Sequence, residues 1–116
     1  MLDQHPGTKV RVFAVWEPIL PTDWSAPTTS ALRRLSDHRV AQFWDKEHLL
    51  AKAMAESRDP ASKPDCCDRR GVLWDLIAVY PAAAVWGQTL PPATVFNGPV
   101  VRSLENSLIA ADLPRR

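Results

Sequence analysis

Residues 9–16 read Lys-Val-Arg-Val-Phe-Ala-Val-Trp, and the fold prediction rests on this segment. It is rich in β-branched and aromatic residues and is continuously apolar from Val12 onward. Such a run is typical of a strand covered on both faces, as in a parallel sheet. A second strand is predicted over 39–44, after a proline-rich loop over 17–27 and a short helix over 28–35. This order predicts two parallel strands joined by a crossover helix.

The middle of the chain continues the alternation of helix and strand. Asp45 is a predicted N-cap for a helix over 45–56, in which apolar residues recur at helical spacing. A polar loop with two prolines follows over 57–71. Residues 72–80 are predicted to form a buried strand, with a short buried helix as the alternative.

The last third of the chain predicts a hairpin and a helix. Asn97 and Gly98 suit the positive φ angles of a two-residue turn, which would join strands over 93–96 and 99–102. A final helix is predicted over 103–111. Asp75 is the one charge inside an apolar stretch, so we expect it at a sheet edge.

Length and charge exclude several classes of protein. The 116 residues are enough for one domain, which we place at 9–113 between an N-terminal tail (1–8) and a C-terminal tail (114–116). The 14 basic and 13 acidic residues leave no excess positive charge for a nucleic acid partner. No apolar run is long enough for a membrane span, and the first ten residues do not resemble a signal peptide. We therefore expect a soluble protein, and its compartment stays open.

Two segments resemble the thioredoxin-like superfamily. The first strand ends in Trp16-Glu17-Pro18, and residues 90–101 read Leu-Pro-Pro-Ala-Thr-Val-Phe-Asn-Gly-Pro-Val-Val. The second segment looks like the family's cis-proline, strand, Asn-Gly turn and returning strand. The resemblance implies a single α/β domain with a mixed central sheet and helices on both faces. However, no cysteine stands at 17–24, where the family's Cys-x-x-Cys would fall, so the family's redox chemistry is not carried over.

Cys66 and Cys67 are the candidate catalytic residues. They are adjacent on a polar loop, so a bond between them would not join distant segments. Reversible oxidation, exchange with a protein thiol partner and capture of a soft metal ion are the functional interpretations. Two incidental surface cysteines are the alternative. The neighbouring charges conflict, because basic residues favour the thiolate and acidic residues oppose it: Lys63, Asp65, Asp68, Arg69 and Arg70.

A second hypothesis is a non-catalytic binding or scaffold domain that uses a proline-rich edge. Its candidate binding residues are Glu17, Asp23, Trp24, Trp86 and Pro92. Solvated acids and a loop packed by its own aromatic residues are the simpler interpretation. No nucleophile or histidine partner accompanies the acids, so the sequence leaves open whether the protein is an enzyme.

No metal site and no cofactor is predicted. The three histidines do not share the spacing of a zinc site, and we expect His48 to be solvated. The four glycines lie far apart, which excludes a glycine-rich phosphate loop.

Overall fold

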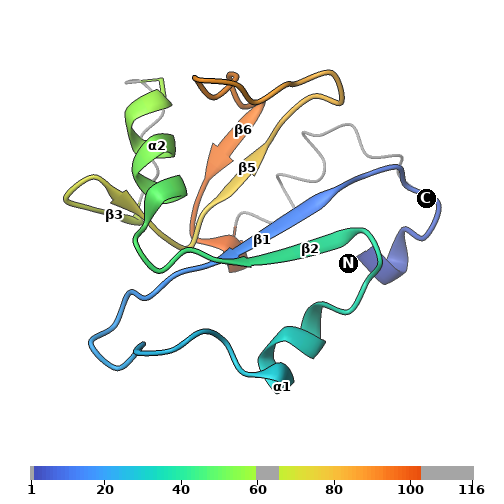
Figure 1. Ribbon diagram of the computed structural model, residues 1–116. Coiled ribbons are helices and arrows are strands. Elements are labelled where there is room, and N and C mark those ends of the chain that lie inside the picture. The colour runs from blue at the N-terminus through green and yellow to red at the C-terminus, as the bar shows by residue number, and fades with distance from the viewer. Residues whose placement is uncertain (1, 60–65, 103–116) are drawn as a thin grey trace. The chain divides into compact units, whose positions relative to one another are not determined.

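The computed structural model describes residues 2–59 and 66–102 (Figure 1). Within the predicted strand over 9–16, Val12–Trp16 form strand β1. β1 pairs in parallel with β2 (Val40–Trp44) in continuous register along both strands. The predicted parallel pair is confirmed.

The helical connection between these strands begins within one residue of the start predicted at Thr28. Helix α1 (Thr29–Leu32) follows Thr28, whose hydroxyl accepts a hydrogen bond from the Ala31 backbone N–H at 3.3 Å. The chain then tightens into the 3-10 helix η2 (Arg33–Leu35). Because an N-cap hydroxyl satisfies one of the free N–H groups of the first turn, Thr28 fixes the start of the helix.

Arg39, the residue before β2, is buried and binds the N-terminal segment. Its Nη1 donates to the His5 carbonyl at 2.7 Å, and its Nη2 donates to the Leu2 carbonyl at 2.6 Å. Nη2 and Nε also donate to the Asp37 carboxylate at 2.6 and 2.9 Å, and the hydrogen bonds from Arg39 hold the pKa of Asp37 well below its usual range. The predicted N-terminal tail, which contains the 3-10 helix η1 (Leu2–Gln4), is thus tied to the strand pair.

Helix α2 (Leu49–Ser57) begins four residues later than predicted. Asp45 still acts at its start, because its Oδ1 accepts from the Leu49 backbone N–H at 2.8 Å. The residues between them form a turn that reaches His48 at φ 58°, a left-handed value that L residues rarely adopt. This turn replaces the first part of the helix predicted over 45–56.

The strand predicted over 72–80 is two strands, β4 (Val72–Leu73) and β5 (Ile77–Val79). Asp75 lies between them at φ 50°, which interrupts the extended chain. Its carboxylate is exposed and accepts from the Val100 backbone N–H at 3.2 Å. A continuous buried strand would have buried this charge at a high cost. Asp75 thus avoids burial, but it lies between the strands and not at the expected sheet edge, and the continuous strand and its helical alternative are also wrong.

The hairpin predicted about Asn97 and Gly98 is also wrong. β6 (Val95–Asn97) pairs antiparallel with β5, and the chain after Pro99 turns into a helix instead of a returning strand. Asn97 Oδ1 accepts from the Gly98 backbone N–H at 2.9 Å, and Pro99, which follows a cis peptide bond, has no N–H for a ladder. The helix and tail predicted beyond residue 102 lie outside the described residues.

The chain forms two compact units, Met1–Leu49 and Leu50–Arg115, called the N-terminal and C-terminal units below. Helices and strands occur together, so the mixed α/β class is confirmed. The strands in the described ranges form three two-stranded sheets instead of the single mixed sheet expected. None of the helices in these ranges is long and apolar enough to cross a membrane.

Replacing Arg39 by alanine is expected to lower the free energy of unfolding by about 3 kcal/mol, because Asp37 and the backbone carbonyls lose their donor. Urea unfolding followed by tryptophan fluorescence measures the change. Arg34→Ala is the matched control: this side chain is exposed and makes no hydrogen bond or ion pair with the described residues, so we expect a loss below about 0.5 kcal/mol. Equal losses in the two variants would contradict the role assigned to Arg39.

Candidate functional site

Cys66 and Cys67 form a disulfide immediately before strand β3 (Asp68–Arg69). The two residues differ in accessibility, because Cys66 is partly exposed and Cys67 is buried with 5% of its surface exposed. The sequence predicts both on a surface loop, and for Cys67 this expectation is wrong. An incoming molecule therefore reaches Cys66 more readily than Cys67.

A hairpin within the predicted polar loop positions Cys67. β3 pairs with β4 through a two-residue loop of Arg70 and Gly71, at φ 54° and 78°. Two successive left-handed residues match the twist of paired strands, and glycine adopts this conformation at little cost. The Trp74 backbone N–H donates to the Cys67 carbonyl at 3.0 Å, which extends the pairing to the cysteine. Gly71 at the end of the polar loop was the signal for this turn.

Gly98 is buried against both sulfur atoms. A Cβ atom on this residue would lie 3.1 Å from Cys67 Sγ and 3.5 Å from Cys66 Sγ. It would also lie 2.7 Å from the Asp75 carbonyl oxygen, a distance at which one of the two atoms must move. The chain can therefore pass the disulfide here because residue 98 has no side chain. The sequence assigned Gly98 to a turn and gave no sign of this contact.

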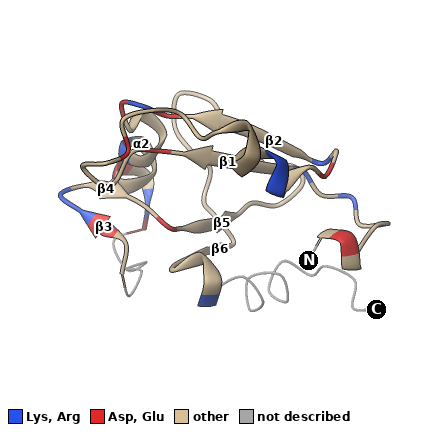
Figure 2. Ribbon diagram, turned by 90° about the horizontal axis from the view of Figure 1, so that it is seen from below, with Lys and Arg blue, Asp and Glu red and all other residues tan. Residues whose placement is uncertain are grey.

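The charged neighbours of the disulfide are not equivalent. The Asp68 carboxylate accepts from Arg58 Nη2 at 2.6 Å and from the Gly71 backbone N–H at 3.0 Å. These bonds, first that from Arg58, lower the pKa of Asp68. Arg69 and Arg70 are exposed and have no hydrogen bond or ion pair through their side chains with the described residues. Figure 2 shows the acidic and basic residues adjoining on β3.

The residues predicted as a binding edge divide between the two units. Glu17, Asp23 and Trp24 belong to the N-terminal unit, whereas Trp86 and Pro92 belong to the C-terminal unit. Each group is therefore a separate candidate binding site, in place of the single proline-rich edge that the sequence predicted.

Asp23 holds its own loop together. Its Oδ2 accepts from the backbone N–H groups of Leu20 and Ile19 at 2.8 and 2.9 Å. These two bonds, first that from Leu20, lower the pKa of Asp23. Trp24 nearby is 85% exposed and stays a candidate for recognition of a partner.

Glu17 has a histidine partner that the sequence did not reveal. Glu17 Oε2 lies 2.7 Å from His48 Nδ1, and the two side chains are 14% and 23% exposed. Burial raises the pKa of Glu17, and the hydrogen bond from His48 opposes this rise. The signal lay in the topology, because Glu17 follows β1, His48 follows β2, and parallel strands end at one edge. The expectation that His48 is solvated is wrong.

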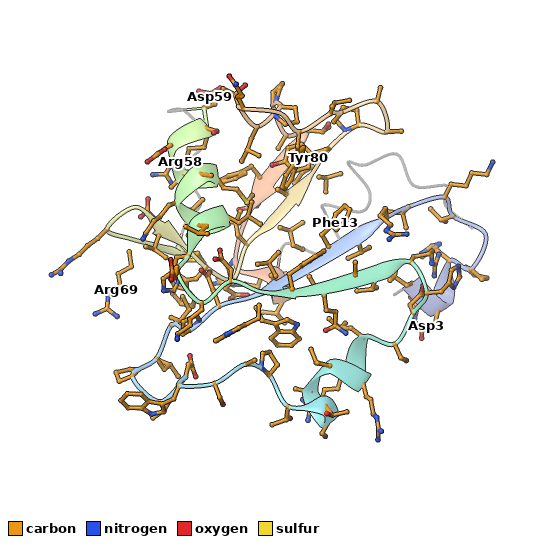
Figure 3. All side chains as sticks on the ribbon, in the orientation of Figure 1. Asp3, Phe13, Arg58, Asp59, Arg69 and Tyr80 are labelled. Atoms are coloured by element: carbon orange, nitrogen blue, oxygen red, sulfur yellow. A yellow bond between two sulfur atoms is a disulfide. The ribbon has the colours of Figure 1, made fainter. Side chains whose placement is uncertain are left out.

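The C-terminal unit contains a cavity of about 470 Å³. Its walls come from the end of α2, from Tyr80 and Phe96, and from the proline-rich segment that includes Pro92. Tyr80 packs edge-on against Trp86 with ring centroids 5.5 Å apart, and burial raises the pKa of Tyr80. Figure 3 labels Tyr80 together with Arg58 and Asp59, which also line the cavity. The structure thus connects Trp86 and Pro92 through Tyr80, a residue that sequence reasoning did not select.

Comparison with known protein families, curated proteins and solved structures finds no match to this chain. The thioredoxin-like resemblance therefore stays a prediction. The disulfide, the Glu17–His48 pair and the cavity are the features from which a function is inferred.

Replacing Gly98 by alanine is expected to destabilise the oxidised protein by about 1–3 kcal/mol, because the added Cβ collides with the Asp75 carbonyl and Cys67 Sγ. Urea unfolding of the oxidised protein measures this loss. Gly87→Ala is the matched control, since a Cβ there meets nothing within 4 Å. A Gly98→Ala protein as stable as Gly87→Ala would show that the close contact is absent.

Proposed function

We propose that the protein carries out thiol–disulfide exchange through Cys66 and Cys67. The observation that carries the proposal is a bonded pair in which Cys66 is partly exposed and Cys67 is buried, with Gly98 against both sulfur atoms. A redox pair needs one sulfur that a partner can attack and a second that can leave and later reform the bond. The unequal exposure of the two cysteines meets this requirement.

The exchange uses a thiol as the reductant. A thiolate from that reductant attacks Cys66 Sγ, a mixed disulfide forms, and the electron pair of the broken bond passes to Cys67 as a thiolate. A second reductant thiolate attacks the sulfur of the reductant in the mixed disulfide and releases Cys66 as a thiolate. The reductant leaves as its own disulfide, two electrons have passed to the pair, and both cysteines take protons from water. The reverse sequence oxidises a dithiol partner.

The backbone at Cys67 gives further support. Cys67 has φ 77°, in the left-handed region that residues with a side chain rarely occupy. Such conformations cluster at functional sites, where the surrounding structure holds them in place. Here the hydrogen bond from the Trp74 N–H to the Cys67 carbonyl holds it.

Soft-metal binding by the reduced pair is a weaker proposal. Two thiolates supply two ligands, and the described residues contain no group of three or more histidine, cysteine or acidic side chains arranged to hold a metal ion. Redox exchange needs only the two sulfur atoms and is the proposal that we favour.

Equilibration with glutathione buffers is expected to give one reversible two-electron transition between the dithiol and the disulfide. Alkylation followed by mass spectrometry of the intact protein measures the oxidised fraction at each potential. A pair that stays reduced in every buffer, or that oxidises irreversibly, would refute the proposed exchange.

Single serine variants test the unequal roles of the two sulfurs. In Cys67→Ser the accessible Cys66 thiol remains, and in Cys66→Ser only the buried thiol remains. We expect alkylation of the reduced Cys67→Ser protein to be at least about tenfold faster than alkylation of the reduced Cys66→Ser protein. Reaction at the buried Cys67 thiol requires local opening of the structure. Alkylation rates measured across a pH series separate the effect of exposure from the effect of thiolate content. If the rate per thiolate is equal in the two variants, the proposed first attack at Cys66 is contradicted.

The cavity supports a second candidate function, the binding of a ligand with an apolar, aromatic part. A volume of about 470 Å³ lies within the usual range of ligand sites, and the wall combines aromatic and proline surfaces with the polar end of α2. The thioredoxin-like resemblance is compatible with either function. Its support is the β1–α1–β2 unit and the prolines that precede β6.

We expect anilinonaphthalene sulfonate, used as an aromatic probe, to bind the folded protein saturably with a fluorescence increase. Ala93→Phe should reduce this binding about tenfold or more, because the added ring occupies the cavity that Ala93 lines. Val85→Ala is the control, since Val85 is exposed and does not line the cavity, so the affinity should stay unchanged. Unchanged affinity in Ala93→Phe would exclude the cavity as the site of probe binding.

A further inference from the structure

Two unpaired arginines follow the disulfide. Arg69 is the last residue of β3 and Arg70 is the first residue of the hairpin loop, so they stand two and three residues after Cys67. Both are exposed, and neither side chain has a hydrogen bond or ion pair with the residues that the structure describes. Figure 3 shows Arg69 extending away from the hairpin. An exposed guanidinium without an ion-pair partner can bind an anionic molecule from solution.

The chain limits how far these charges are from the sulfurs. Three residues span at most about 11 Å between Cα atoms, so the Cα atoms of both arginines lie well within the Debye length of roughly 30 Å that holds at 0.01 M salt. Charges at this separation still act on one another through water.

The nearby acidic groups offset these arginines only in part. Asp68 is paired with Arg58 at 2.6 Å and adds no free negative charge. Asp75 carries an exposed carboxylate that accepts from the Val100 N–H, so one negative charge opposes two positive ones. In the sequence before the pair, Lys63 and Asp65 have opposite charges. The balance around the disulfide is positive.

We propose that the thiol that exchanges with Cys66 and Cys67 is a small anionic thiol, one that carries a carboxylate. This inference rests on the proposed exchange function and specifies its substrate class. A guanidinium attracts a carboxylate, so Arg69 and Arg70 would raise the local concentration of an anionic thiol near Cys66. The partial exposure of Cys66 suits an attacking molecule of small size.

Three thiols of different charge test the inference on the full-length oxidised protein: 3-mercaptopropionate, 2-mercaptoethanol and cysteamine. Second-order rate constants for reduction of the Cys66–Cys67 disulfide are measured at low salt and corrected for the thiolate fraction of each thiol. Each constant is then divided by the rate constant of the same thiol with a neutral model disulfide. We expect 3-mercaptopropionate to react about threefold faster than 2-mercaptoethanol and cysteamine to react more slowly than both. The differences should shrink in 1 M salt.

The double variant R69A/R70A should abolish the preference for 3-mercaptopropionate while the rate with 2-mercaptoethanol stays within about twofold. The matched control is R33A/R34A, an exposed arginine pair of η2 whose replacement changes the net charge by the same amount. Its preference should equal that of the unmodified protein. Equal rates for all three thiols, or a preference that survives in R69A/R70A, would overturn the inference and leave the exchange function intact. Failure of every thiol to reduce the pair would overturn both.

Discussion

The close approach of Gly98 to the Cys66–Cys67 disulfide is the contact on which the described part of the C-terminal unit depends. A two-stranded ribbon is barely stable alone, and this unit contains two of them, β3–β4 and β5–β6. Gly98 follows the second ribbon and lies against the sulfurs that precede the first. The few buried apolar residues of the described ranges include Cys67 and, on the other strand of the hairpin, Leu73. The packing contact and the proposed redox pair therefore lie at the same position.

In the N-terminal unit, the charged side chain of Arg39 connects segments that are distant in the sequence. Arg39 is buried, and it joins the first residues of the chain to the loop before β2 through backbone carbonyls and the Asp37 carboxylate. A guanidinium has five N–H donors in a fixed plane, so a single side chain can satisfy several acceptors that burial would otherwise leave unpaired. Both units thus contain a specific contact where strand pairing alone provides little buried surface.

The sequence predicted those parts of the fold that are set by local signals. The apolar runs of β1 and β2 lie where residue types alone indicate them, and Asp45 acts at the start of the helix that it was predicted to cap. The errors occur where distant segments compete with a local preference. Asn97 and Gly98 favour a tight turn, but pairing of β6 with β5 and the contact of Gly98 with the sulfurs determine their conformation instead. In the site, adjacency made the cysteines visible, whereas Gly98, Tyr80 and the His48 partner of Glu17 depend on contacts between segments far apart in the chain.

A glycine at position 98 serves both redox states of the proposed exchange. In the oxidised state the missing side chain lets the backbone lie next to two bonded sulfur atoms. Reduction breaks that bond, and two separate sulfur atoms need about 3.5–4 Å between them, as other non-bonded atoms do. The two separated sulfur atoms then occupy more space, and a side chain at residue 98 would fill the space next to them. Glycine at position 98 would therefore suit the proposed reduction as well as the contact in the oxidised protein.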